Sequence, residues 1–234
     1  MLADEQGSIL SIWREACAII GRYPLATFFP AAVLGTLGAA PYYFIKAGGF
    51  DLPEEVLTTL TGLFAYYLYI VYTTYAEEIT LESERGAERI TILGVVDELR
   101  QASSVVPSVL VASVGAILIP LAATTLLVIP GLWLLTRWSL FAPVISRERL
   151  GPVVALKRSN ELVQGHFELV FLTAAFGTVL EEAGSHAGAV AGLLVTNSDT
   201  WGQWLGGSIF TTLFMPLAAF ATSATYTYLQ RASY

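Results

Sequence analysis

Three ionisable residues stand close together in a stretch that is otherwise apolar or small. Residues 178–186 read TVLEEAGSH, so Glu181 and Glu182 are adjacent and His186 follows Glu182 by four positions. A helix would place His186 on the same face as Glu182. One carboxylate and one imidazole supply two ligands, whereas a catalytic zinc site usually has three protein ligands. We therefore expect no metal and no cofactor here, and the role of these charges depends on the medium around them.

The composition indicates a membrane protein. The chain is 55% hydrophobic and 13% charged, whereas soluble domains carry about 25% charged residues. Residues 103–136 and 200–230 contain no charged residue, and a helix needs only about 20 apolar residues to cross the hydrocarbon core. The single cysteine, Cys17, excludes an internal disulfide. The net charge of -7 argues against a nucleic-acid partner, which a basic patch would normally meet.

The apolar runs predict an all-α fold, a polytopic membrane helical bundle that forms a single domain over residues 1–234. We predict six transmembrane helices, at about 24–45, 56–77, 104–128, 131–146, 167–194 and 204–229. Three further stretches carry apolar residues at helical spacing with charged residues opposite. They are predicted to be amphipathic interfacial helices on the cytoplasmic face, at about 8–21, 90–102 and 152–164.

Two local signals refine this arrangement. Ile129-Pro130-Gly131 is predicted to form a tight hairpin turn between the third and fourth spans, because proline ends a helix and glycine permits a turn. One bent helix with a re-entrant end is the alternative. Gly184, Gly188 and Gly192 leave one helix face without side chains, which suits either a tight helix contact or a homodimer seam.

The distribution of basic residues predicts the orientation. Cytoplasmic loops keep an excess of Lys and Arg, and in the six-span arrangement only Lys46 falls on the opposite side. Both termini are therefore predicted to be cytoplasmic. The acidic opening MLADEQ lacks the basic region of a cleavable signal peptide. The residues on the cytoplasmic side are Arg14, Arg22, Arg85, Arg89, Arg100, Arg147, Arg149, Lys157, Arg158 and Arg231.

Arg137 is a further charge inside a predicted span. At 1.5 Å per helical residue, Arg137 lies about 9 Å below the outer boundary, and Glu181 and Glu182 lie about 7 to 9 Å below it. An unpaired ion in hydrocarbon is costly, so we predict that Arg137 pairs with Glu181 or Glu182. The cluster of Arg137, Glu181, Glu182 and His186 has three interpretations: a structural ion pair, a proton or solute pathway, or an enzymatic or metal site.

A second group of charges follows the fourth span. Glu148 lies between Arg147 and Arg149, just before Gly151-Pro152, and is predicted to anchor the turn into the third surface helix through local ion pairs. Lys157, Arg158 and Ser159 are predicted to contact anionic headgroups, which contribute about 1 kcal/mol per basic residue. Topological retention by the positive charges is the alternative. The acidic residues of the cytoplasmic segments are interpreted as a solvated face: Glu77, Glu78, Glu82, Glu84, Glu88, Asp97 and Glu98.

Residues 129–171 resemble a known family. Their pattern combines the Pro130-Gly131 pair, Arg137, Pro143, Glu148 followed by Gly151-Pro152, the Ala155–Ser159 element and Gly165. The segment TYTYLQR at residues 225–231 also belongs to the resemblance. The pattern resembles a largely uncharacterised bacterial family of six-span proteins related to the membrane domain of glycerophosphoryl diester phosphodiesterase. The resemblance implies a multi-pass protein of the bacterial cytoplasmic (inner) membrane. It does not imply phosphodiester hydrolysis, which belongs to a separate soluble domain.

The sequence leaves the function open among three classes. The first expectation is a noncatalytic integral membrane protein that organises lipid or a partner protein, with membrane lipids, a protein partner or a homodimer contact as partners. The alternative is a small transporter or channel that uses Arg137, Glu181 and Glu182. A lipid-modifying membrane enzyme ranks third, because the chain offers few nucleophiles, bases and metal ligands.

Overall fold

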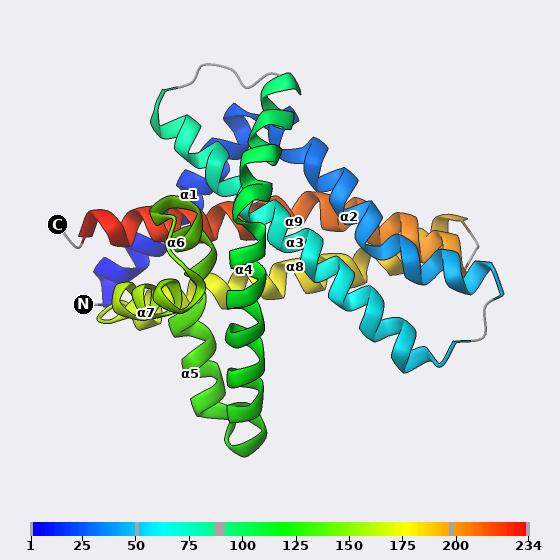
Figure 1. Cartoon of the computed structure of the whole chain (residues 1–234). Coiled ribbons are helices and arrows are strands. Elements are labelled where there is room, and N and C mark those ends of the chain that lie inside the picture. The colour runs from blue at the N-terminus through cyan, green and yellow to red at the C-terminus, as the bar shows by residue number, and fades with distance from the viewer. Residues whose placement is uncertain (1, 50–51, 87–91, 197–198, 233–234) are drawn as a thin grey trace.

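The described part of the chain is helical and contains no strand (Figure 1). The structure is a computed structural model that describes residues 2–49, 52–86, 92–196 and 199–232. Its helices, in chain order, are α1 (Leu2–Arg22), α2 (Pro24–Ala47), α3 (Glu54–Glu84), α4 (Ile92–Leu126), α5 (Val128–Trp138), α6 (Phe141–Glu148), α7 (Pro152–Val163), α8 (Phe167–Thr196) and α9 (Asp199–Ala232). The predicted all-α class is thus confirmed.

Two helices begin at a proline, and a glycine lies in the junction between two helices. Pro24 and Pro152 begin α2 and α7, where a missing N–H costs no hydrogen bond. Gly165 has φ 91°, a left-handed conformation that glycine adopts without strain. It lies in the junction at which α7 and α8 meet at 111°. The bounds of α2 and α7 agree with the predicted helices at 24–45 and 152–164.

Glycines bring α8 and α9 into close contact. A Cβ atom at Gly188 would lie 2.7 Å from the Phe210 Cβ and would also collide with the backbone oxygen of Gly206. Gly184 and Gly192 likewise face Phe214 and Gly202. Glycines on one face let helix backbones approach closely. The face formed by Gly184, Gly188 and Gly192 is therefore used for a contact within the chain.

Helix α2 packs on α3 and α9. The Tyr72 hydroxyl donates to the Thr27 carbonyl oxygen at 2.9 Å, and the Tyr75 hydroxyl donates to the Ala26 carbonyl oxygen at 2.7 Å. Both tyrosines are fully buried. Buried tyrosines are stable where the hydroxyl finds a partner, so these bonds fix α3 against the beginning of α2.

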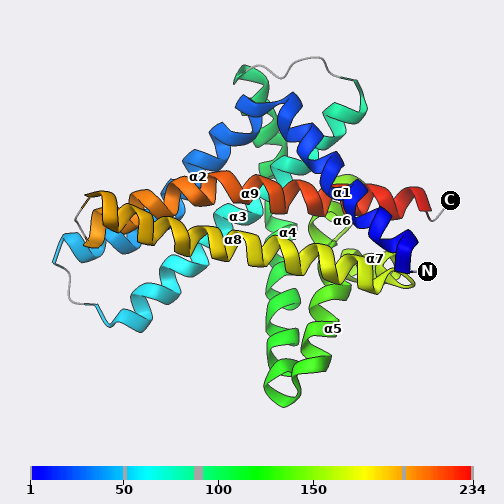
Figure 2. The same ribbon diagram turned by 180° about the vertical axis from the view of Figure 1, so that it is seen from behind.

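The α4–α5 hairpin extends from the body in a direction different from that of α2, α8 and α9 (Figures 1 and 2). Its turn differs from the prediction. Leu127 has an extended backbone and precedes α5, so Pro130 and Gly131 lie inside the first turns of that helix. Proline is tolerated in a first turn, and the hairpin turn is formed by Leu127 instead of Ile129-Pro130-Gly131.

Four helical segments are long and apolar enough to cross a membrane: Pro24–Ala47, Glu54–Glu84, Val128–Glu148 and Trp201–Ala232. Two more qualify only as bent pairs, Gly94–Ala102 with Ser104–Pro120 and Pro152–Val163 with Phe167–Thr196. The structure thus contains four to six apolar helices compatible with a transmembrane protein. Segment Val128–Glu148 combines α5 and α6.

The three predicted surface helices agree with the structure to different extents. Helix α1 covers the predicted 8–21 and begins earlier, at Leu2, and α7 coincides with the third prediction. The second, at 90–102, is the first part of α4, which bends by 44° between Ala102 and Ser104, and its residues 90 and 91 lie outside the described part. Helix α7 exposes Val153 and Val154, which suits a helix lying on apolar material.

Candidate functional site

A cavity of about 550 Å³ lies between α2, α3, α8 and α9. We call it the acidic cavity. Its lining contains Glu181 and Glu182, and no lysine or arginine is among the described residues that form it. The full lining is Leu34, Gly35, Gly38, Ala39, Tyr42, Tyr43, Thr58, Thr61, Gly62, Ala65, Leu68, Tyr69, Glu181, Glu182, Ser185, Thr211 and Met215. Its size is within the usual range of small-molecule sites, about 300–1,000 Å³.

The two carboxylates of α8 occupy different surroundings. Glu181 is partly buried, whereas the Glu182 side chain is 70% exposed. His186, four residues further, lies 3.8 Å from the Glu182 carboxylate through its Nδ1 atom. This contact confirms that His186 and Glu182 share a helix face. The two glutamates and the histidine therefore lie together, as predicted, but Arg137 does not join them.

Arg137 lies against α7. Its Nη1 atom donates to Asn160 Oδ1 at 2.8 Å, and its guanidinium carbon lies 4.0 Å from the centre of the Trp133 ring. Among the described residues, no ion pair joins Arg137 to Glu181 or Glu182, so the predicted pairing is wrong. Helix α5 contacts α8 as well as α4 and α7, but the Arg137 side chain is held by Asn160 and Trp133. Glu181 and Glu182 instead line a cavity that α2 and α3 share.

Ser159 is part of the same junction and does not contact headgroups. Its hydroxyl is fully buried, donates to the Arg137 carbonyl oxygen at 2.9 Å and accepts from the Leu140 backbone N–H at 3.2 Å. Those two backbone groups flank the break between α5 and α6, where helical hydrogen bonds are missing. Ser159 therefore stabilises the break. Lys157 is exposed and Arg158 is partly exposed, as headgroup contact would require.

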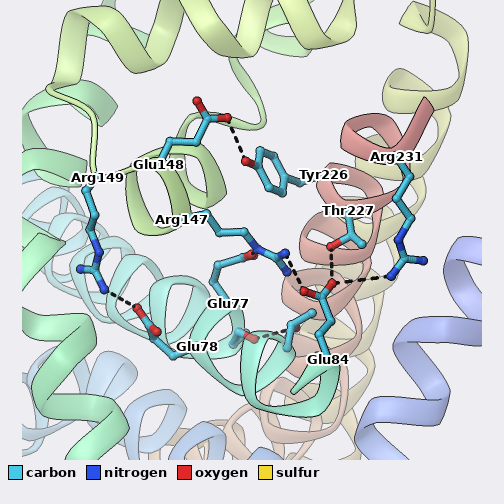
Figure 3. Close-up of polar contacts among 11 residues, drawn as sticks. Glu77, Glu78, Glu84, Arg147, Glu148, Arg149, Tyr226, Thr227 and Arg231 are labelled. Atoms are coloured by element: carbon cyan, nitrogen blue, oxygen red, sulfur yellow. Dashed lines mark hydrogen bonds and ion pairs between the residues drawn. The ribbon is translucent and has the colours of Figure 1, made fainter. Parts of the chain in front are cut away.

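A second polar region joins α3, α6 and α9, and Figure 3 shows it. Arg147 on α6 pairs through Nε with Glu77 on α3, and its Nη1 donates to Glu84 at 3.0 Å. The side chains of Arg147 and Glu77 are 8% and 2% exposed. Glu84 also accepts from the Thr227 hydroxyl at 3.2 Å and lies 3.8 Å from Arg231. We call these four charged residues, Glu77, Glu84, Arg147 and Arg231, the Arg147 network. Its Arg147–Glu77 pair is buried, whereas the side chains of Glu84 and Arg231 are 30% and 65% exposed.

The neighbouring charges pair over long distances in sequence as well. Arg149 donates to Glu78 at 3.1 Å, and Glu148 accepts from the Tyr226 hydroxyl at 2.9 Å (Figure 3). Glu148 also accepts from Arg158 on α7 at 3.3 Å. Glu148 was predicted to anchor the turn into the third surface helix through local ion pairs. Its pair with Arg158 joins the turn to α7, whereas Arg147 and Arg149 pair with carboxylates of α3. Arg149 ends α6 in a left-handed conformation with φ 52°. The turn is therefore held by contacts with α3, α7 and α9.

The sequence interpretation missed the burial of the acidic end of α3. Glu77 and Glu78 were interpreted as part of a solvated face, yet they are 1% and 4% exposed. A signal was present in the sequence. Glu77 follows Tyr69 and Thr73 at intervals of four residues, so it continues the face that those residues form. Arginines at 147 and 149 provide the countercharges that buried carboxylates require.

The part of the chain that the structure describes contains no group of three or more His, Cys, Asp or Glu side chains that could hold a metal ion. No protein-family model, curated protein or solved structure matches the chain.

Proposed function

We propose that this protein is a small membrane transporter or channel for a cationic solute, with Glu181 and Glu182 as its binding carboxylates. The observation that carries the proposal is the acidic cavity, where two carboxylates face an open volume without a basic residue in the described lining. A protein that only spans the membrane would gain from filling this volume with apolar side chains. Intramembrane carboxylates generally mark ion or substrate pathways.

The uncharged residues of the cavity lining also suit a cation. Tyr42, Tyr43 and Tyr69 contribute aromatic rings and hydroxyls to the cavity, and tyrosine rings attract ammonium groups. The Lys46 ammonium already lies 4.8 Å from the centre of the Tyr42 ring and 3.0 Å from Glu54. An amine of the chain itself thus makes the kind of contact that we propose for the solute.

The number of spans and the side of the membrane on which each terminus lies are part of what we propose. We propose six spans, formed by α2, α3, α4, α5 with α6, α8 and α9. Helices α1 and α7 and both termini then lie on the cytoplasmic side of a bacterial inner membrane. The basic residues support this orientation. The resemblance to the six-span family of the phosphodiesterase membrane domain belongs to the same proposal, and it concerns location and not activity.

A noncatalytic role in organising lipid or a protein partner is the second candidate. The exposed Lys157 on α7, with the exposed Val153 and Val154, favours contact with anionic headgroups. This candidate explains α7 but assigns no role to the acidic cavity. It expects a retained lipid or protein and no flux, so a flux measurement separates the two candidates.

The test is uptake of radiolabelled choline, a membrane-impermeant probe cation, into proteoliposomes with an inside-negative potential. Uptake above that of protein-free liposomes supports transport, and the double variant Glu181→Gln with Glu182→Gln is expected to lose it. The matched control is Glu161→Gln, which neutralises an exposed glutamate on α7. Uptake equal to that of empty liposomes, or full uptake by the double variant, would overturn the proposal for this class of cation.

A further inference from the structure

One face of α3 lines three separate cavities. The acidic cavity is followed by a cavity of about 100 Å³ and a cavity of about 360 Å³. A series of α3 residues along them recurs at intervals of three or four, which places it on one helix face. The series is Thr58, Gly62, Ala65 and Tyr69 in the acidic cavity, Tyr69, Thr73 and Glu77 in the second, and Thr80 and Glu84 in the third. Thr61 and Leu68, Tyr66 and Ile70, and Ser83 of α3 also line the three cavities in turn.

Helix α9 lines the same three cavities. A series of its residues recurs every four positions: Thr211 and Met215 in the acidic cavity, Ala219 and Ser223 in the second, where Thr222 joins them, and Arg231 in the third. Thr227, in the same series, donates to Glu84. Helix α1 supplies the rest of the third cavity through Glu15, Ala18, Ile19 and Arg22. Because α3 and α9 run past each other over this length, their two faces form a continuous seam, which we call the α3–α9 seam.

The cavities are linked by shared residues. Tyr69 lines both the acidic cavity and the second cavity. Glu77 lines the second cavity and pairs with Arg147, which also binds Glu84, and Glu84 lines the third cavity. Carboxylates therefore lie at three successive levels along the seam: Glu181 and Glu182 of α8 at the acidic cavity, then Glu77, then Glu84. The Arg147 network lies between the second and third cavities.

The second cavity has room for only a few water molecules, since each occupies about 30 Å³ in the liquid. Hydroxyl groups of Thr73, Ser139, Thr222 and Ser223 surround it, with the Glu77 carboxylate at one side. Waters bridging hydroxyls to a carboxylate form the kind of chain that carries protons across membranes.

We infer that the α3–α9 seam is a proton pathway in which Glu77 is the inner proton-binding group. The Glu77 carboxylate takes a proton from the second cavity and becomes a neutral carboxylic acid. It then gives the proton to water on the Glu84 side and returns to its ion pair. This inference rests on the proposed function, because the proton enters through the acidic cavity.

The charges around Glu77 allow this step. Arg147 from α6, Glu84 from α3, and Tyr226 and Ser223 from α9 face Glu77. When Glu77 is neutral, Arg147 retains Glu84 as its partner, so protonation leaves no arginine without a countercharge. The Arg147 Nη2 atom is buried and has no hydrogen-bond partner, which leaves one donor free for a water molecule beside the network.

The experiment measures proton flux in proteoliposomes that contain a fluorescent pH indicator, with potassium and valinomycin setting an inside-negative potential. We expect wild-type vesicles to acidify faster than protein-free liposomes. Glu77→Gln is expected to reduce the flux to that of protein-free liposomes. A second variant, Thr73→Val with Ser223→Ala, removes two hydroxyls of the second cavity without changing a charge and is expected to reduce the flux as well.

Thr136→Val is the matched control, because Thr136 is buried on α5, lines none of the three cavities, and donates its hydroxyl to the Leu132 carbonyl oxygen of its own helix. It should conduct protons as the wild type does. Wild-type flux no faster than that of protein-free liposomes, or wild-type flux in the folded seam variants, would overturn the inference. Choline uptake in the same vesicles separates the two proposals. Choline uptake without proton flux would contradict the proton pathway alone. Proton flux without choline uptake would contradict only the transport of choline-like cations.

Discussion

Arg147 reaches from α6 to Glu77 on α3 across a sequence separation of 70 residues, and the two side chains form an ion pair that is almost fully buried. This pair links the acidic end of α3 to the segment after the α4–α5 hairpin. Removing one member of a buried ion pair leaves the other charge without compensation.

Arg147→Gln is therefore expected to destabilise the protein by about 3 to 5 kcal/mol. The double variant Arg147→Gln with Glu77→Gln should recover part of that loss. The measurement is reversible unfolding by sodium dodecyl sulfate in mixed micelles. Glu161→Gln, which affects an exposed pair with Arg158, should change stability by about 1 kcal/mol or less. Equal losses for Arg147→Gln and Glu161→Gln would contradict this account of the network.

The close approach of α8 and α9 predicts a different response from two glycines. Gly188→Ala places a Cβ against the Gly206 backbone and Phe210, and overpacking of this kind costs about 1–3 kcal/mol. Nothing lies within 4 Å of a Cβ at Gly62, so Gly62→Ala should be neutral or stabilising, by up to about 1 kcal/mol. Thermal unfolding in detergent compares the two, and similar stabilities would refute the tight contact.

Ser159 links the two sides of the α5–α6 break. Ser159→Ala removes the bonds to Arg137 and Leu140, and each hydrogen bond contributes about 0.5–1.5 kcal/mol. We expect a loss of about 1–3 kcal/mol in the same micelle assay. Ser104→Ala is the control, because Ser104 is exposed and bonds only the Gln101 carbonyl within its helix. A neutral Ser159→Ala variant would show that the break needs no such support.

Arg137 offers a test of the corrected charge cluster. Its contacts are Asn160 and Trp133, so Arg137→Gln should leave cation binding in the acidic cavity unchanged. A stability loss of about 0.5–2 kcal/mol is expected from the lost contact with the Trp133 ring. Isothermal titration with choline provides the measurement. A change in choline affinity as large as that of the Glu181 and Glu182 variants would show that Arg137 acts together with these two carboxylates.

Much of the helical framework could be predicted from the sequence, because a charge-free run long enough to cross a membrane has few alternatives to a helix. The first residues of α2 and α7 follow from Pro24 and Pro152, and Gly165 follows the end of α7. The position of the hairpin turn could not be predicted in the same way. Pro130 suits both a turn and the first turn of a helix, and the backbone of Leu127 decides between them.

The partners of the charges could not be predicted from depth alone. Counting residues along each span assumes that the spans run parallel, but α4–α5 and α8–α9 extend in different directions (Figure 1). Arg137 therefore meets Asn160, and Glu181 faces a cavity. The burial of Glu77 was predictable in principle, since it continues the face of Tyr69 and Thr73. Its partner, Arg147, required the fold, because it lies 70 residues away.

The most direct test of the central claim compares two ligands of the same shape in lipid nanodiscs. Choline carries a quaternary ammonium, and 3,3-dimethylbutan-1-ol is its neutral isostere. We expect the wild type to bind choline in preference to the alcohol. We expect the double variant Glu181→Gln with Glu182→Gln to lose this preference. Equal binding of both ligands by the wild type, or an unchanged preference in the double variant, would contradict the claim that these two carboxylates form a cation site.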